Sequence, residues 1–203
     1  MKIYFSPTSP FVRKCLVAAE ELGLGGRITL LPSNAHPIDR DAGILPTNPL
    51  GKVPTFVTED GQALYDSRVI CEYLNERAQG SLFPAAGPSR WATLTRQSLG
   101  DGMMDAALLA RYEDALRPEP IRWPEWRAAQ LDKVSTSLAA LENEQTAPRG
   151  GSDIGSIAVG CALWYLDLRF RDIGWRQHYP ATAQWYAEFG KRESMMRVWS
   201  LES

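Results

Sequence analysis

Short β-prone runs and amphipathic stretches alternate along residues 1–78. Residues 3–5 and 28–31 are apolar runs of strand length, and apolar residues recur at helical spacing from Val12 to Leu22 between them. Ser9 is a favourable N-cap, and Pro10 suits a first helical position because its missing N–H would be unpaired there anyway. This strand, helix, strand order predicts two parallel strands joined by the helix.

A hairpin and a second helix follow this unit. Residues 55–58 and 63–65 are the predicted strands, and an Asp-Gly turn within residues 59–62 joins them. Asp66-Ser67 then offers an N-cap to a segment whose apolar residues again recur at helical spacing. The order of these elements is that of a thioredoxin-like domain.

The pattern changes after residue 78. Residues 79–89 contain two glycines and two prolines and are the predicted linker. Beyond the linker the strand signals end, and helical patterns cover residues 90–116, 125–145, 156–171 and 181–192. The predicted fold is therefore α/β plus all-α, with a thioredoxin-like domain over residues 1–78 and an all-helical bundle domain over residues 90–203.

The composition is that of a soluble globular protein. The 203 residues are 44% apolar and 23% charged, and the net charge of −2 gives no global attraction to nucleic acid or to an anionic membrane. No apolar run approaches the roughly 20 residues that span a bilayer, and we expect a cytoplasmic protein with neither nucleic acid nor membrane among its partners. Three cysteines in apolar surroundings are expected to be buried free thiols, and with two histidines no metal site is predicted.

Ser9 is the first candidate for chemistry. At a helix N-terminus, the helix dipole and unpaired N–H groups stabilise an anion. A hydroxyl donor there could hold a bound thiol as its thiolate and lower the thiol pKa of about 8.5 by roughly one to two units. Two alternatives stay open: Ser9 only caps the helix, or the nearby hydroxyl of Thr8 or Ser6 takes the role.

Val53-Pro54 is the second candidate, because it stands directly before a predicted strand. Proline cannot donate to a sheet ladder, and X-Pro bonds adopt the cis form far more readily than other peptide bonds. A cis turn would point the backbone groups of Val53 outward, as a clamp for a peptide ligand. An ordinary loop-to-strand junction is the alternative.

Together, Ser9-Pro10-Phe11, Val53-Pro54 and Asp66-Ser67 resemble the cytosolic glutathione transferases in order and spacing, and they point to a bacterial subgroup. The resemblance covers essentially the whole chain. It implies glutathione as a co-substrate, a role in detoxification and a homodimer.

The resemblance also implies roles for individual residues. Ser9 would be catalytic, and Val53 with the cis Pro54 would pair through its backbone with the cysteinyl part of glutathione. Lys52 would approach the glycyl carboxylate, with a solvated lysine as the alternative. Asp66 and Ser67 would bind the γ-glutamyl end of glutathione. The Ser67 hydroxyl and the helix N-terminus would bind its α-carboxylate, and Asp66 would face its α-ammonium group.

The helical half offers weaker signals. By resemblance, the helix containing Asp101 and Asp105 would line the acceptor pocket, and either carboxylate is a candidate to reach glutathione. Met103, Met104, Tyr112 and Trp164 are candidates for an adaptable apolar wall, with core packing as the alternative for each.

The chain departs from the family pattern at two places. In the family, the central helix usually has a Ser or Thr that is followed three residues later by Asp. Here Ser156 is followed by Val159 at that place, so Ser156 alone or Asp153 must cap this helix. Position 9 holds no cysteine, which counts against thiol-disulfide chemistry. We therefore predict a glutathione transferase that acts on small apolar electrophiles. A glutathione-binding or protein-interaction member without transferase activity is the alternative.

Overall fold

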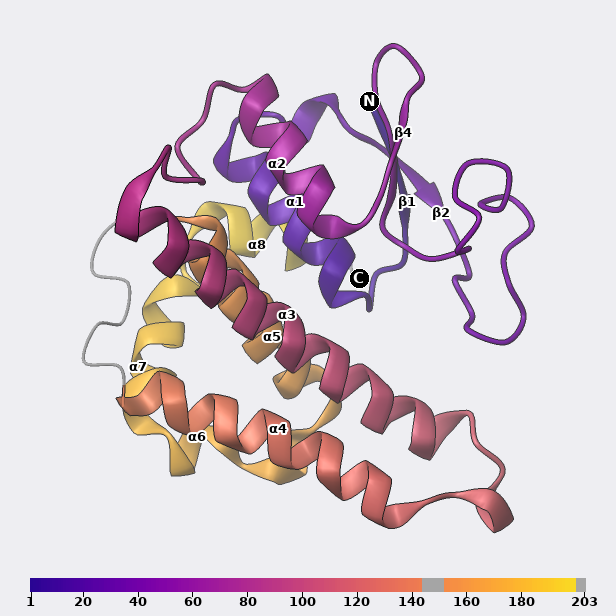
Figure 1. Ribbon diagram of the computed structural model, residues 1–203, viewed down its shortest axis with the longest axis vertical. Helices are drawn as coiled ribbons and strands as arrows, with labels where there is room; N and C mark the ends of the chain where they lie inside the picture. Colours follow the sequence, from indigo (N-terminus) through magenta and orange to yellow (C-terminus); the bar gives the residue numbers. More distant parts are fainter. Residues whose placement is uncertain (144–151, 200–203) are drawn as a thin grey trace.

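The structure is a computed structural model that describes residues 1–143 and 152–199. An N-terminal part containing the sheet lies above a larger helical part, whose longest helices extend away from the sheet (Figure 1). Residues 144–145, the end of a predicted helix, and residues 200–203 of the predicted helical domain lie outside the described residues.

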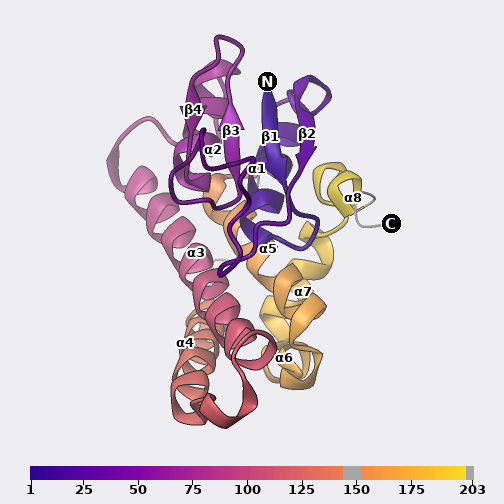
Figure 2. The same ribbon diagram turned by 90° about the vertical axis from the view of Figure 1, so that its right-hand side faces the viewer.

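The strands of the described residues form one mixed sheet in the order β2-β1-β3-β4 (Figure 2). They are β1 (Lys2–Phe5), β2 (Thr29–Pro32), β3 (Thr55–Val57) and β4 (Ala63–Leu64). β1 pairs with β2 in parallel, while β3 pairs with β1 and β4 in antiparallel fashion. The predicted parallel unit and the predicted hairpin are both confirmed.

Two helices complete the N-terminal domain. The helix α1 (Pro10–Glu21) connects β1 to β2, and α2 (Ser67–Arg77) follows β4. They pack against each other on one side of the sheet, where Ile3, Phe56 and Ile70 are fully buried. The result is the thioredoxin-like domain that the sequence predicts.

Helices and short turns make up the rest of the described chain. The helices are α3 (Gly87–Ala115), α4 (Pro124–Asn143), α5 (Ile154–Arg169), α6 (Trp175–His178), α7 (Pro180–Phe189) and α8 (Glu193–Trp199); the 3-10 turns are η1 (Gly25–Arg27), η2 (Glu119–Ile121) and η3 (Arg171–Ile173). None of these helices has both the length and the apolar content needed to cross a membrane.

The helices differ from the prediction at several places. α3 begins at Gly87, inside the predicted linker, because Pro88 occupies its first turn, where a missing N–H costs nothing. The segment predicted as one helix over residues 181–192 ends at Phe189, and α8 then begins at Glu193. The short helix α6 was not predicted at all.

The central helix α5 is buried from Ile154 to Leu166. Asp153 is its N-cap and accepts hydrogen bonds from the Ser156 N–H at 2.7 Å and the Ser156 hydroxyl at 2.8 Å. Of the two predicted possibilities, capping by Asp153 is therefore correct. A Cβ at Gly100 of α3 would lie 2.6 Å from the carbonyl carbon of Ala158, so glycine allows α3 and α5 to touch.

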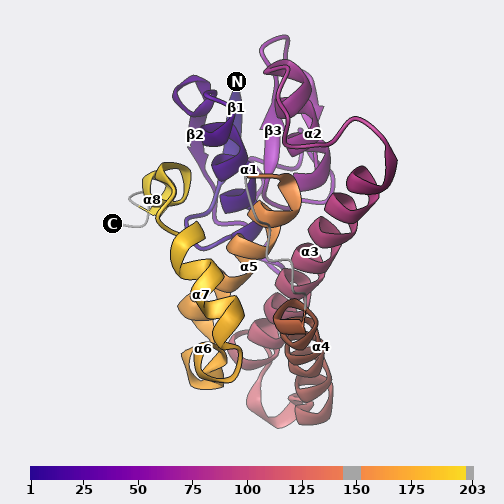
Figure 3. The same ribbon diagram turned by 90° about the vertical axis from the view of Figure 1, so that its left-hand side faces the viewer.

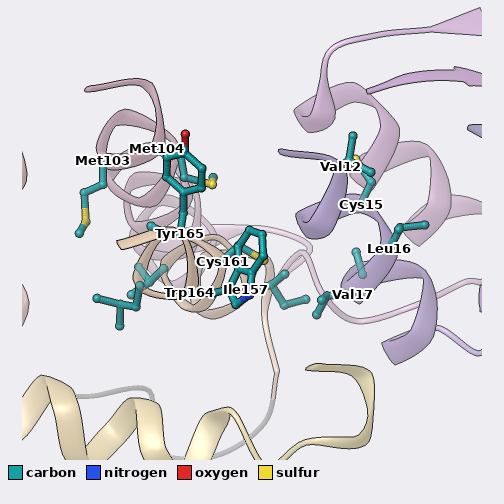
Figure 4. Close-up of a cluster of buried hydrophobic side chains, with 14 of the residues drawn as sticks. Val12, Cys15, Leu16, Val17, Met103, Met104, Ile157, Cys161, Trp164 and Tyr165 are labelled. Carbon is teal, nitrogen blue, oxygen red and sulfur yellow. The ribbon is translucent and has the colours of Figure 1, made fainter. Parts of the chain in front are cut away.

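The two domains share one core. Buried side chains of α1, α3 and α5, with Val17, Met104 and Trp164 among them, belong to one continuous cluster (Figure 4). α1 is buried on almost every side because it lies between α2 and the helical domain, and α8 packs against it as well (Figure 3). The core therefore fixes α1 and the residue before it relative to both domains.

Candidate functional site

The strand register brings the three sequence motifs to one edge of the sheet. Tyr4 of β1 pairs with Thr55 of β3, so the loop from Ser6 to Ser9 leaves the sheet where Val53–Pro54 enters it. Phe56 of β3 pairs with Leu64, the last residue of β4, so Asp66 and Ser67 follow at the same edge. The Ser9 motif, which precedes the other two by more than 40 residues in the sequence, thus becomes their neighbour.

Ser9 is the N-cap of α1. Its hydroxyl oxygen accepts a hydrogen bond from the Val12 N–H at 3.3 Å, and the side chain is half-buried. The hydroxyl hydrogen can still be donated to a second group, because a serine hydroxyl is both donor and acceptor. Thr8 is exposed, and the Ser6 carbonyl accepts a hydrogen bond from the Ser9 N–H at 3.1 Å. Both predicted alternatives therefore lie beside Ser9.

The Val53–Pro54 peptide bond is cis, with Pro54 buried and Val53 half-buried. Among the described residues, no backbone–backbone hydrogen bond uses the N–H or carbonyl of Val53. The side chain of Asn48, only 1% exposed, supports this loop. Its amide donates to the Thr55 hydroxyl at 2.8 Å, and its carbonyl accepts from the Leu50 N–H at 2.9 Å.

Asp66 is the N-cap of α2 and accepts a hydrogen bond from the Arg68 N–H at 2.9 Å. Its side chain is exposed, whereas Ser67 is only 2% exposed. The Ser67 carbonyl accepts a weak hydrogen bond from the Cys15 thiol of α1 at 3.8 Å. Behind the exposed carboxylate, the start of α2 is thus packed against α1.

A buried group of charges that the sequence did not reveal lies behind this edge. Asp101 of α3 accepts from the Lys14 ammonium at 2.6 Å and from the Arg68 guanidinium at 2.8 Å. The side chains of Lys14 and Asp101 are 0% and 2% exposed. Burial lowers the pKa of Lys14, but the Asp101 carboxylate outweighs that effect and raises it above its ordinary value, so the ammonium stays charged.

This pairing separates the two candidate carboxylates. Asp101 is only 1% exposed and its oxygens pair with Lys14 of α1 and Arg68 of α2, so it is the less favourable of the two for a contact with glutathione. Asp105, one turn further along α3, remains a candidate. Burial and the Asp101 carboxylate raise the pKa of Asp105, whereas Arg68 and Lys52 act in the opposite direction. Asp105 thus lies within electrostatic reach of the exposed lysine before Val53.

Comparison with known proteins adds to this geometry. Residues 8–77 match the family model described as "Glutathione S-transferase, N-terminal domain", and residues 124–188 match "Glutathione S-transferase, C-terminal domain". The uncharacterized GST-like protein YibF of Escherichia coli (strain K12) is 33% identical over 202 residues, which cover 98% of each chain. The chain belongs to the glutathione S-transferase family.

Solved structures of other members support this assignment. A glutathione transferase family member from Pseudomonas fluorescens Pf-5, with bound glutathione, shares 44% identity and a TM-score of 0.94, with 97% of each chain covered. A glutathione S-transferase from Methylobacillus flagellatus KT, also with glutathione bound, shares 35% identity and a TM-score of 0.85, with 97% of this chain and 98% of that chain covered. Human elongation factor 1-gamma is 24% identical over 91% of this chain and 43% of its own length.

In this chain, most of the residues considered for an apolar pocket wall belong to the core. Met103, Met104 and Trp164 are 1%, 0% and 0% exposed, and Figure 4 shows them in the buried cluster. Core packing, the alternative for each residue, is therefore correct for these three. Tyr112 differs because it is only half-buried, and burial raises the pKa of its hydroxyl.

The cysteines are free and buried, as predicted. Cys15 and Cys71 of the neighbouring helices have their sulfurs 4.0 Å apart, and burial raises the pKa of Cys15 well above its ordinary value. Burial likewise raises the pKa of Cys161 to about 12. Within residues 1–143 and 152–199, no group of three His, Cys, Asp or Glu side chains is arranged to hold a metal ion.

Proposed function

We propose that this protein is a glutathione transferase in which Ser9 holds the glutathione sulfur as a thiolate for attack on a small, mainly apolar electrophile. The observation that carries the proposal is the convergence of the three motifs on one sheet edge, with the Ser9 hydroxyl at the N-terminus of α1. A helix N-terminus and a hydroxyl donor both favour the negatively charged sulfur over the neutral thiol.

The proposed glutathione site uses the remaining residues of this edge. Val53, held by the cis Pro54, pairs through its backbone with the cysteinyl part, and its lack of backbone partners among the described residues supports this role. Asp66 binds the γ-glutamyl ammonium, while Ser67 and the α2 N-terminus bind the adjacent carboxylate. Lys52 is exposed and free to approach the glycyl carboxylate.

Catalysis under this proposal needs glutathione as co-substrate and no metal. The protein supplies proximity and a pre-formed anion site. A family member from Pseudomonas fluorescens Pf-5, 42% identical with a TM-score of 0.89, was crystallised with S-(propanoic acid)-glutathione. Because this ligand is substituted on sulfur, it has the form of a conjugation product, which supports conjugation as the reaction class.

The ultraviolet difference spectrum of bound glutathione, titrated over pH, tests the proposal directly, since thiolate absorbs where thiol does not. In the wild type, we expect bound glutathione to ionise at least one pH unit below the free thiol value of about 8.5. Ser9→Ala should abolish the shift while glutathione still binds.

Thr8→Ala and Ser6→Ala are the matched controls, because each removes a hydroxyl from the same loop. If Ser9 is the activating residue, both controls keep the wild-type ionisation. Loss of the shift in Thr8→Ala with retention in Ser9→Ala would assign the role to Thr8. Absence of any glutathione binding by the wild type would overturn the proposal as a whole.

The second candidate function is a glutathione-binding or protein-interaction member of the family without transferase activity. The likeness to elongation factor 1-gamma favours it, since that relative is named for a role outside conjugation. Glutathione that binds but remains protonated in the wild type at every pH up to the free thiol pKa would support this candidate.

The proposal includes a cytoplasmic homodimer that acts in detoxification. Two exposed apolar side chains on adjacent helices support self-association: Val69 of α2 is 47% exposed and Trp91 of α3 is 66% exposed. Arg90 and Glu72 form an ion pair between the same two helices at 3.2 Å.

A further inference from the structure

Two arginines and two tyrosines gather where α3 and α5 end. Tyr165 lies within electrostatic reach of Arg169, Tyr112 and Arg111. The helices run in the same direction at their contact, since Gly155 touches α3 near Thr93 and the later residues Gly100 and Ala158 also meet. Arg111 and Tyr112 therefore come level with Tyr165 and Arg169.

Of this cluster, Tyr112 lies on the same face of α3 as Asp101 and Asp105, further from the proposed glutathione site. Asp101, Asp105, Leu108 and Tyr112 follow one another at spacings of four, three and four residues, which places them on one side of a helix. Asp101 contacts the start of α2 through Arg68. Tyr112 is seven residues after Asp105, and this corresponds to about 10 Å along the helix axis. A molecule that reaches past the sulfur of glutathione would meet this end of α3.

The two arginines lack acidic partners. Among the described residues, no carboxylate lies within 4.0 Å of Arg111 or Arg169, although both side chains are half-buried. Nearby arginines are paired: Arg117 with Glu113 at 2.8 Å and Arg176 with Asp167 at 2.6 Å. Two partly desolvated guanidinium groups without counter-ions form a site that favours an anion, and the planar fork of arginine matches a carboxylate.

We infer that Arg111 and Arg169, with Tyr112 beside them, bind a carboxylate at the far end of the electrophile. The inference rests on the proposed function and narrows the electrophile to an apolar body with one carboxylate. With a chloronitrobenzoate, for example, the thiolate sulfur bonds to the ring carbon and chloride leaves with the electron pair of the broken bond. The carboxylate is unchanged and stays on the arginines. Leu108 and the Tyr112 ring contact the apolar body.

Calorimetric binding of two matched conjugates tests the inference without catalysis. The ligands are S-(4-carboxybenzyl)glutathione and S-(4-methylbenzyl)glutathione. The first carries a carboxylate where the second carries a methyl group. We expect the wild type to bind the carboxylate ligand about tenfold more tightly, equivalent to about 1.4 kcal/mol. Arg111→Met and Arg169→Met should each reduce this preference to threefold or less, with little effect on the methyl ligand.

Arg117→Met is the control, since Arg117 lies just beyond the end of α3 and is paired with Glu113. It should keep the tenfold preference. In the wild type, the preference should also shrink as salt rises from 0.05 to 0.5 M, a readout that needs no variant. Equal binding of both ligands, or a preference that survives the Arg111 and Arg169 substitutions, would overturn the inference and leave the proposed function intact. Failure of both ligands and of glutathione to bind would instead remove the proposed function.

Discussion

The Lys14–Asp101 pair is difficult to explain as a source of stability alone. Both side chains are almost completely buried, and taking two charges out of water costs several kcal/mol for each ion before their attraction offsets it. An apolar pair of similar volume would often be equally stable. The ion pair instead fixes the relative positions of the helices, because it joins one point of α1 to one point of α3 and, through Arg68, to the start of α2.

A double-mutant cycle separates these contributions. Asp101→Leu leaves the Lys14 ammonium buried without its carboxylate, and we expect the free energy of unfolding to fall by about 3–5 kcal/mol. Lys14→Met combined with Asp101→Leu removes both charges and should restore most of that loss. Urea unfolding of the four proteins measures the cycle. A double variant that is as unstable as Asp101→Leu would show that packing, not the unpaired charge, accounts for the loss.

Local chemistry decides which site residues can be predicted from sequence. Ser9 and Asp66 carry their signal in the adjacent residues, because an N-cap precedes a helical pattern, and the structure places both at helix N-termini. Asn48 and Lys14 carry no comparable signal. A lysine within an amphipathic helix is typical of a solvated face, and the partner of Lys14 is 87 residues away.

At the scale of elements, α8 and the residue directly before it hold α1 in place. Arg192 donates two hydrogen bonds to Glu21, at 2.8 and 2.7 Å, and the Ser194 hydroxyl donates to the same carboxylate at 2.5 Å. Near the start of α1, Arg13 donates to the Met195 carbonyl at 2.9 Å, and its guanidinium lies 4.4 Å from the Trp164 ring centroid. Because Ser9 caps this helix, contacts with α8 help to set the orientation of the candidate site.

The Glu21 contacts predict a dependence on pH. Burial raises the pKa of Glu21, but the hydrogen bonds from Arg192 and Ser194 outweigh it and hold the pKa below its ordinary value of 4.5. A lowered folded-state pKa contributes stability above pH 4.5, and that contribution is lost as pH falls through the folded value. Glu21→Gln should therefore cost about 2 kcal/mol at pH 7, and its difference from the wild type should narrow below pH 4.5.

Thermal unfolding of both proteins between pH 3 and 8 measures this difference. Glu20→Gln is the control, because the Glu20–Arg197 pair is longer, at 3.2 Å, and the arginine side chain is 61% exposed. We expect the control to lose less than about 1 kcal/mol. A Glu21→Gln difference that stays constant down to pH 3 would contradict the electrostatic explanation.

Element length explains most of the differences between predicted and observed structure. The 12-residue α1 and the 16-residue α5 repeat their apolar positions over several turns, and such repeats are readily recognised. α6 has four residues and α8 has seven, too few turns for a period to be visible. The sheet could be predicted despite strands of two to four residues because an Asp-Gly turn and a Ser-Pro helix start bound them.

At the scale of the whole molecule, one shared core makes the two domains a single structural unit. α1 contacts both α2 of its own domain and α5 of the helical domain. The sheet edge that carries the three motifs and the end of α3 are therefore fixed in position relative to each other. On the surface, two exposed tryptophans lie at separate places. Trp91, in the first turns of α3, is 66% exposed, whereas Trp123, directly before α4 and hydrogen-bonded to Glu113 near the end of α3, is 60% exposed.

Substitution of Trp91 tests the proposed dimer. If α2 and α3 form a two-fold interface, each dimer buries Trp91 twice, and a buried tryptophan of this kind contributes about 2 kcal/mol or more. Trp91→Glu should therefore weaken association by about 4 kcal/mol, roughly a thousandfold, and convert a dimer at 10 µM into a monomer. Sedimentation velocity measures the change, with Trp123→Glu as a control of equal chemistry that should remain dimeric. A dimer that survives Trp91→Glu and dissociates in Trp123→Glu would move the interface to the tip of the α3–α4 pair, and a monomeric wild type would remove the dimer from the proposal.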